Sequence, residues 1–156
     1  MKKIPLGDGV YTVESEEKDE AIRWDATFHK GSDLCELRIP DGVTAIAGHG
    51  LEYCDHLSRV YMPTSVAYLG DAIFYGLRQR IEIYYAGTAE EFRRIGEPRR
   101  VQKEVQVPGK YDHQPFCNTA GTYYKTETVT ESFDHFCADC HVFCADGTEL
   151  LYGYRN

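Results

Sequence analysis

The residues best suited to chemistry are three cysteines and a histidine near the C-terminal end. Cys137-Ala138-Asp139-Cys140-His141 matches the C-x-x-C-H spacing, and Cys144 follows shortly after. This spacing is typical of covalent haem attachment, of a redox-active dithiol and of half a zinc site. Each of these functions makes different demands on the surrounding sequence.

Haem attachment and redox chemistry are poorly supported by the flanking residues. Haem attachment requires export, but Gly7 and Asp8 stand where the apolar stretch of a leader should follow the two N-terminal lysines. A redox dithiol is favoured at a helix N-terminus, which lowers the thiol pKa. Phe136 and residues 142–143 instead predict a core strand. We therefore expect neither function.

Zinc is the third possibility, because thiolate and imidazole are its preferred ligands. The candidate ligands are Cys137, Cys140 and Cys144 with His135 or His141. Such a knuckle normally pairs with a second one, for which only Cys117 and His113 are distant candidates. Buried free thiols are the simpler interpretation, since cysteine packs as a small hydrophobe. We expect no cofactor, and a zinc-containing structural or regulatory protein is the alternative.

Composition narrows the function classes. The chain has 156 residues, a net charge of -8, 42% hydrophobic and 13% aromatic residues, which predicts one folded domain. Phosphate-rich nucleic acids and anionic membranes would repel so acidic a chain, and no apolar run approaches the roughly 20 residues of a membrane-spanning helix. The phosphate-binding glycine loop, G-x-S-x-G and H-E-x-x-H are all missing. We expect no catalytic residues, no nucleic-acid partner and no membrane insertion.

The same lack of a leader predicts a cytoplasmic protein with reduced cysteines. The alternative is a cell-surface or secreted protein, if the chain is a processed fragment.

An internal repeat organises the middle of the chain. Residues 37–43 align with residues 60–66 at an offset of 23, and the same offset relates Ile46 to Leu69 and Cys54 to Leu77. A fixed period of this length is typical of a solenoid, in which each unit buries its apolar face against its neighbours. We therefore predict stacked repeats.

Each repeat contains a strand that alternates with a period of two, at residues 36–39, 59–62 and 82–85. Shorter extended pieces at 43–46 and 66–69 would form a second wall. The predicted inward residues are Leu37, Ile39, Val60, Met62, Ile83 and Tyr85. Two outward columns follow: Glu36, Arg59, Glu82, and Arg38, Tyr61, Tyr84. Exposed arginine and tyrosine are enriched at binding hot spots, so Arg38, Tyr61, Tyr84 and the neighbouring Arg59 are candidate binding residues. A plain surface ladder is the alternative.

The repeat resembles the BspA-type leucine-rich repeat. Ile39-Pro40-Asp41-Gly42-Val43-Thr44-Ala45-Ile46, followed by Leu51, Cys54, Leu57 and Val60, is similar to the pattern of that family. The resemblance implies a mainly β fold: a short right-handed leucine-rich-repeat solenoid with N- and C-terminal caps and a short helix. It also implies a non-enzymatic protein–protein interaction module. Longer members of the family are surface-borne and adhere to host proteins, so a surface adhesin fragment is a further alternative.

Three regions follow along the chain: an N-terminal cap at 1–27, repeats at 28–95, and an irregular connection with a C-terminal β cap at 96–156. Residues 8–13 mimic residues 41–46, which predicts an N-terminal strand at the start of the stack. Thr88-x-x-Glu91 is a capping box that opens a helix through Ile95. Strands are predicted at 101–107, 123–129 and 141–144, the last two completing the C-terminal cap.

Positive charge gathers between residues 78 and 103, whereas both ends of the chain are acidic. The basic residues are Arg78, Arg80, Arg93, Arg94, Arg99, Arg100 and Lys103. A solvated face with local ion pairs is the favoured interpretation. Docking of an anionic partner near the end of the repeats, or head-to-tail contact between copies of the chain, is the alternative.

Overall fold

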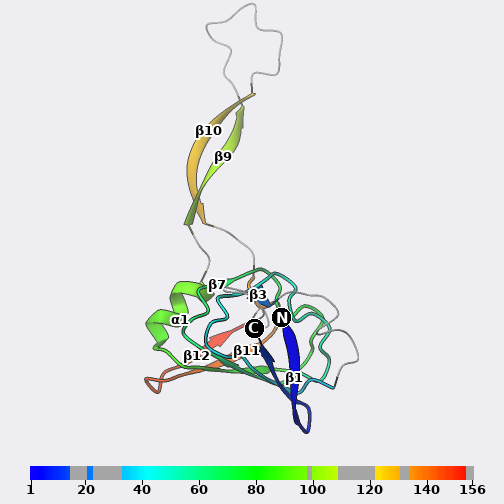
Figure 1. Cartoon of the computed structure of the whole chain (residues 1–156). Helices are drawn as coiled ribbons and strands as arrows, with labels where there is room; N and C mark the ends of the chain where they lie inside the picture. Colours follow the sequence, from blue (N-terminus) through cyan, green and yellow to red (C-terminus); the bar gives the residue numbers. More distant parts are fainter. Residues whose placement is uncertain (15–20, 23–32, 98–99, 109–121, 131–133, 154–156) are drawn as a thin grey trace, which may run out of the picture. The chain divides into compact units, whose positions relative to one another are not determined.

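A computed structural model of the chain describes residues 1–14, 21–22, 33–97, 100–108, 122–130 and 134–153 (Figure 1). The described part is mainly β with one short helix. Its strands are β1 (Lys2–Gly7), β2 (Val10–Glu14), β3 (Ala21–Ile22), β4 (Glu36–Arg38), β5 (Ala45–Ile46), β6 (Arg59–Met62), β7 (Tyr68–Leu69), β8 (Ile81–Tyr85), β9 (Arg100–Pro108), β10 (Thr122–Thr130), β11 (Cys140–Cys144) and β12 (Glu149–Tyr152), and its helix is α1 (Ala89–Gly96).

The chain forms two compact units. The first consists of Met1–Glu97 and Phe133–Asn156, and the second of Pro98–Ser132. The first unit holds a seven-stranded sheet in the order β1-β2-β4-β6-β8-β11-β12 and a three-stranded sheet in the order β3-β5-β7. The second unit holds the antiparallel pair β9 and β10.

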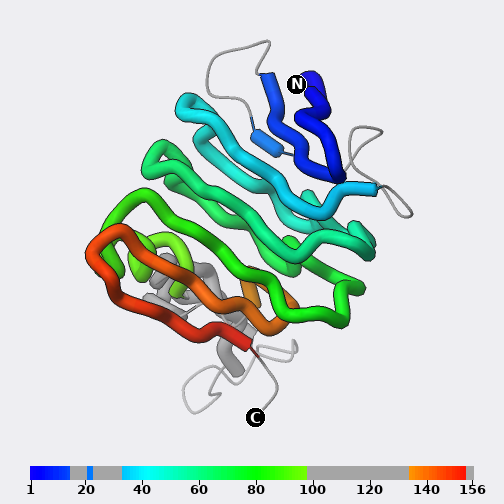
Figure 2. The backbone as a smooth tube through the Cα atoms, turned by 90° about the horizontal axis from the view of Figure 1, so that it is seen from below, coloured from blue at the N-terminus to red at the C-terminus, as the bar shows by residue number. Residues whose placement is uncertain are grey.

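The predicted register of the repeat is confirmed in both sheets of the first unit. Leu37 pairs with Val60 and Val60 with Ile83 in the long sheet, and Ile46 pairs with Leu69 in the short one. All these strands run parallel, and partners differ by 23 residues in sequence. Successive 23-residue segments of the chain, which we call passes, therefore lie side by side, as the colour order in Figure 2 shows.

Backbone hydrogen bonds continue this stacking outside the strands. The amide of Leu51 donates to the carbonyl of Ile73, and the amide of Tyr53 to that of Tyr75. These turn segments thus pair at almost the same offset as the strands, which satisfies backbone groups that would otherwise be buried without partners.

Alternation within each strand places the apolar side chains in one core. Every predicted inward residue is buried, with exposed fractions between 0% and 6%: Leu37, Ile39, Val60, Met62, Ile83 and Tyr85. Ile46, Leu69, Cys54 and Leu77 complete the same core from the short sheet and the turns. Each such side chain stabilises the fold by about 1.5 to 3 kcal/mol when fully buried.

The N-terminal strand begins the stack as predicted, but in a different sheet from the one that its sequence likeness implies. β2 pairs in parallel with β4, and Val10 lies opposite Glu36. The likeness equates Val10 with Val43, which would place β2 beside β5. The strand that pairs with β5 on that side is β3. The shared Asp-Gly is turn chemistry: Gly7, Asp8 and Gly9 all have positive φ and form the turn between β1 and β2.

Helix α1 follows β8 as predicted and begins with the expected capping box. The Thr88 side chain accepts a hydrogen bond from the Glu91 amide, and the Glu91 side chain accepts one from the Thr88 amide. Phe92 is fully buried, whereas Glu90 and Arg94 lie on the exposed face. The helix therefore packs one face on the core and ends at Gly96.

The strands predicted at 101–107 and 123–129 are confirmed as β9 and β10. Tyr123 lies opposite Val107 and Val129 opposite Val101, so β10 pairs with β9. β11 instead pairs with β8 and β12 in the long sheet. The ladder partners of β10 thus come from its neighbour in sequence.

Candidate functional site

The predicted outward column forms a continuous ladder on one face of the seven-stranded sheet. Arg38 pairs in register with Tyr61, and Tyr61 with Tyr84. The Arg38 guanidinium lies 5.6 Å from the centre of the Tyr61 ring, and the Tyr61 and Tyr84 rings stack with centroids 4.8 Å apart. Cation–π contact and ring stacking therefore hold these side chains in one row.

The row continues onto β11, which the sequence analysis did not foresee. Phe143 pairs in register with Tyr84, and their rings stack with centroids 5.1 Å apart. The imidazole of His141 lies 4.2 Å from the Phe143 ring, and its Nε2 is 3.0 Å from a carboxylate oxygen of Glu149. We call Arg38, Tyr61, Tyr84 and Phe143 the aromatic ladder, and the sheet face that carries them the outer face.

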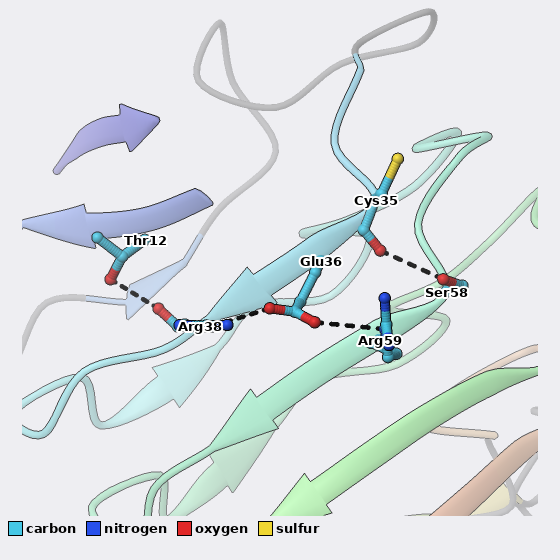
Figure 3. A network of polar contacts seen from close by, with 6 residues as sticks. All are labelled: Thr12, Cys35, Glu36, Arg38, Ser58 and Arg59. Carbon is cyan, nitrogen blue, oxygen red and sulfur yellow. Dashed lines mark hydrogen bonds and ion pairs between the residues drawn. The ribbon is translucent and has the colours of Figure 1, made fainter. Parts of the chain in front are cut away.

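Glu36 is buried although it belongs to an outward column, and Figure 3 shows its carboxylate between Arg38 and Arg59. The residue is 4% exposed. Its Oε2 is 2.8 Å from Nε of Arg38, and its Oε1 is 3.3 Å from Nε of Arg59. The two arginines are half exposed and cover the carboxylate from opposite sides, so both of its oxygens are paired.

Glu82, the third residue of the outward column that begins with Glu36 and Arg59, contacts a tyrosine. Its Oε2 accepts a hydrogen bond of 2.7 Å from the Tyr84 hydroxyl. This hydrogen bond raises the pKa of the Tyr84 phenol, because the neutral phenol is the donor. In the described residues no ion pair joins Arg59 to Glu82, and Arg59 pairs with Glu36 instead.

Two hollows flank Tyr61 and Tyr84. A charged hollow of about 230 Å³ lies at the N-terminal ends of β6 and β8. It is lined by Ser58, Arg59, Arg80 and Glu82. An apolar hollow of about 300 Å³ lies at the C-terminal ends of the same strands. It is lined by Ile39, Met62, Pro63, Tyr85, Ala86 and the two tyrosine rings. The outer face thus combines cations, ring edges and an apolar recess.

The candidate zinc ligands do not converge. On β11 the buried Cys140 and Cys144 lie on the inner face, whereas His141 lies on the other. The two cysteines are four residues apart along a strand, about 13 Å, which is too far for thiolates that must each lie about 2.3 Å from one ion. Cys137, in the preceding turn, is half-buried, and no group of three metal-ligating side chains forms in the described part of the chain. Cys117 and His113 lie outside the described residues.

Three of the described cysteines, Cys54, Cys140 and Cys144, are buried. Burial raises the pKa of Cys140 and Cys144, and it raises the pKa of Cys54 to about 12. His135 is also buried, with Nδ1 2.9 Å from the Gly70 carbonyl oxygen and Nε2 3.3 Å from the Glu97 carbonyl oxygen. These contacts place His135 in the framework and not on the outer face.

The described basic residues between 78 and 103 include two with assigned surroundings in the first unit. Arg94 pairs with Glu90 on the exposed face of α1, at 3.1 Å. Arg80 alone among them lines the charged hollow. Arg99 lies outside the described residues.

Phe143 was not predicted as a ladder residue because the second unit lies in sequence between β8 and β11. The partners Ile83 and Val142 differ by 59 residues, and removal of the 35 residues of the second unit would leave 24. That value is one more than the period of 23. The signal that could have found Phe143 is therefore the same period, read after the interruption is taken out.

Compared with protein-family models, curated proteins and solved structures, the chain matches none. No helix in the described residues is long and apolar enough to cross a membrane.

Proposed function

We propose that this protein is a protein–protein interaction module built on a short right-handed solenoid of the BspA-like leucine-rich-repeat type, with no chemistry of its own. The aromatic ladder carries the proposal. Leu37, Val60 and Ile83 stack in parallel at 23-residue steps, which supports the repeat architecture. Parallel crossovers of this kind are right-handed in about 98% of cases.

Several properties of the outer face support a binding role. Tyr61 is 37% exposed although it is a large aromatic residue, and its ring is fixed between Arg38 and Tyr84. Rigid aromatic and arginine side chains contribute most to interface energies, because little conformational entropy is lost when they bind. The ladder is therefore preorganised for a partner.

The test is affinity capture with a variant that removes the ladder. Wild-type protein and the triple variant Arg38→Ala, Tyr61→Ala, Tyr84→Ala are used as baits against the same extract, to which host extracellular proteins are added. We expect the triple variant to lose the proteins that the wild type captures. Thermal unfolding of each bait verifies that it is folded.

A control with the same residue types is available away from the outer face. Tyr68, Tyr75 and Arg78 are exposed and lie on the short sheet and its adjoining turn. The variant Tyr68→Ala, Tyr75→Ala, Arg78→Ala should capture the same proteins as the wild type. Equal capture by the ladder variant, or equal loss by the control, would contradict the proposed function.

A further inference from the structure

The charged hollow has an excess of positive charge. Arg59 is held by Glu36, and the Glu82 carboxylate is engaged by the Tyr84 hydroxyl. Arg80 is exposed and makes no ion pair with any residue that the structure describes. Arg80 therefore supplies this hollow with a guanidinium that takes part in no described ion pair, and such a group suits the carboxylate of a ligand.

The apolar hollow is complementary to an uncharged side chain. Ile39, Met62 and Pro63 line it with Tyr85, and Ala86 is exposed at its rim. These residues present carbon surface, so a charged or strongly polar side chain would be desolvated there without a partner. An aliphatic or aromatic side chain fits this recess.

The spacing of the hollows suggests a peptide in extended conformation. Along the segment that contains β6, residues 58–59 line the charged hollow and residues 61–63 line the apolar hollow. Three to four residues along a strand correspond to about 10 to 13 Å. An extended peptide that follows the strands spans this distance between its residues i and i+4, which lie on the same side, and residue i+2 then lies over Tyr61 and Tyr84.

From this arrangement we infer that the outer face binds an extended peptide segment with one acidic side chain for the charged hollow and, four residues away, one apolar side chain for the apolar hollow. This inference rests on the proposed function and specifies its partner. The net charge of -8 restricts the segment to few acidic residues, because the protein as a whole repels anions.

Selection from a randomised peptide library tests the inference. The immobilised full chain should enrich peptides with an acidic and an apolar residue four positions apart, in one fixed order. Selection on Arg80→Gln should lose the acidic preference but keep the apolar one. Selection on Ala86→Glu, which places a carboxylate at the rim of the apolar hollow, should lose the apolar preference.

Binding of the selected peptide then gives the magnitudes. By fluorescence anisotropy, Arg80→Gln should weaken binding about fivefold, as expected for one partly exposed ion pair. Ala86→Glu should weaken it about tenfold or more, because the apolar side chain would meet a charge. Arg78→Gln and Ala67→Glu are the controls, since both residues are exposed and line neither hollow, and both variants should bind like the wild type.

Failure of this inference is distinguishable from failure of the proposed function. A selection that enriches no peptide, a consensus without the acidic–apolar pair, or a pair that persists on both variants overturns the inference. If the triple ladder variant still loses the captured proteins in that case, the proposed function stands and the partner class is wrong.

Discussion

At the scale of single residues, Glu36 differs most from what its place in an outward column predicts. Its carboxylate is buried because Arg38 from its own strand and Arg59 from the next strand lie over it. A carboxylate removed from water needs partners for both oxygens, and the two arginines provide them. The same contacts position Arg38 against the Tyr61 ring, so Glu36 supports the aromatic ladder from below.

Glu36→Gln should lower the free energy of unfolding by about 1 to 3 kcal/mol, because the charge that both arginines contact is lost. Urea denaturation measures the change. Glu90→Gln is the matched control: its partner is also an arginine, but both side chains are at least 70% exposed. That control should change stability by about 0.5 kcal/mol or less. Equal effects of the two substitutions would contradict a structural role for Glu36.

The thiols differ in burial and should differ in reactivity. Burial raises the pKa of Cys54 from 9.0 to about 12 and also raises that of Cys140, whereas Cys35 is only half-buried. At neutral pH iodoacetamide should modify Cys35 in the native protein and reach Cys54 and Cys140 only on unfolding, because the thiolate is the nucleophile. Peptide mass spectrometry measures this order. Native-state labelling of Cys140 as fast as that of Cys35 would contradict it.

A pH dependence of stability follows from the same raised pKa. Below pH 9 the Cys54 thiol is protonated in both the folded and the unfolded state, so its full contribution to the free energy of unfolding is present. This contribution is lost as the pH rises toward 12, because the unfolded state releases the proton more readily than the folded state. Urea denaturation across this range should show declining stability. Cys54→Val should show a smaller decline, and part of it should remain because burial also raises the pKa of Tyr152, Tyr85, Cys140 and Cys144. An unchanged slope in Cys54→Val would count against burial as the cause.

At the scale of elements, the close approach of successive passes depends on glycine at one contact. The Gly70 amide donates to the Ile46 carbonyl at 2.8 Å. A Cβ on Gly70 would lie 2.1 Å from the Gly48 amide nitrogen and 2.6 Å from its Cα. Both atoms belong to the backbone and cannot rotate away, so β5 and β7 can pair as they do only without a side chain there.

Gly70→Ala should therefore cost about 2 to 4 kcal/mol of stability, as overpacking against backbone does. Thermal and urea unfolding provide the measurement. Gly153→Ala is the comparison, because the nearest atom to its Cβ is a carboxylate oxygen of Asp139, which can rotate. We expect a change below about 1 kcal/mol for Gly153→Ala. A tolerated Gly70→Ala would show that the two passes separate more easily than their spacing implies.

At the scale of the whole molecule, the second unit lies in sequence between β8 and β11, two strands that pair with each other. The amides of Ile73 and Phe74 donate to the carbonyls of His135 and Phe136, which continue the turn ladder of the preceding passes. The two ends of the interruption meet, because Nε2 of His135 lies 3.3 Å from the Glu97 carbonyl oxygen. The first unit is thus continuous in space although it is discontinuous in sequence.

Deletion of residues 98–132, with a short Gly-Ser linker between the new ends, should leave the first unit folded. Circular dichroism and a single cooperative urea transition would show this, because the deletion removes no strand of either sheet in that unit. Deletion of residues 98–136 is the control and should abolish cooperative unfolding, since it also removes Phe136, which is 1% exposed in the core. Loss of cooperativity in the shorter deletion would contradict the insertion.

Much of the fold follows from local sequence. The alternation at Leu37 and Ile39, and at Val60 and Met62, predicted both the strands and their buried faces, because a strand turns every second side chain to one side. The period of 23 residues predicted which strands pair. Thr88 and Glu91 predicted where α1 begins, since a capping box depends on two side chains within one turn.

The candidate site was only partly predictable. Arg38, Tyr61 and Tyr84 follow from the period, and the structure brings them into one ladder. The place of Phe143 in the ladder does not follow from the period, because the second unit separates β11 from β8 in sequence. The burial of Glu36 does not follow either, because it depends on the arginine rotamers that cover the carboxylate. The spacing of the cysteine cluster left a zinc site open as an alternative to buried thiols, and only the structure shows that β11 sends Cys140 and His141 to opposite faces.

The sequence by itself determined the mainly β architecture, the 23-residue pairing and the identity of the core, because these depend on periodic apolar positions and on local turn and capping chemistry. Tertiary structure alone decided that Phe143 extends the ladder, that Glu36 lies under two arginines and that hollows flank the tyrosines. The physical reason is that these features depend on contacts between residues distant in sequence, whose approach is set by how whole passes of the chain stack.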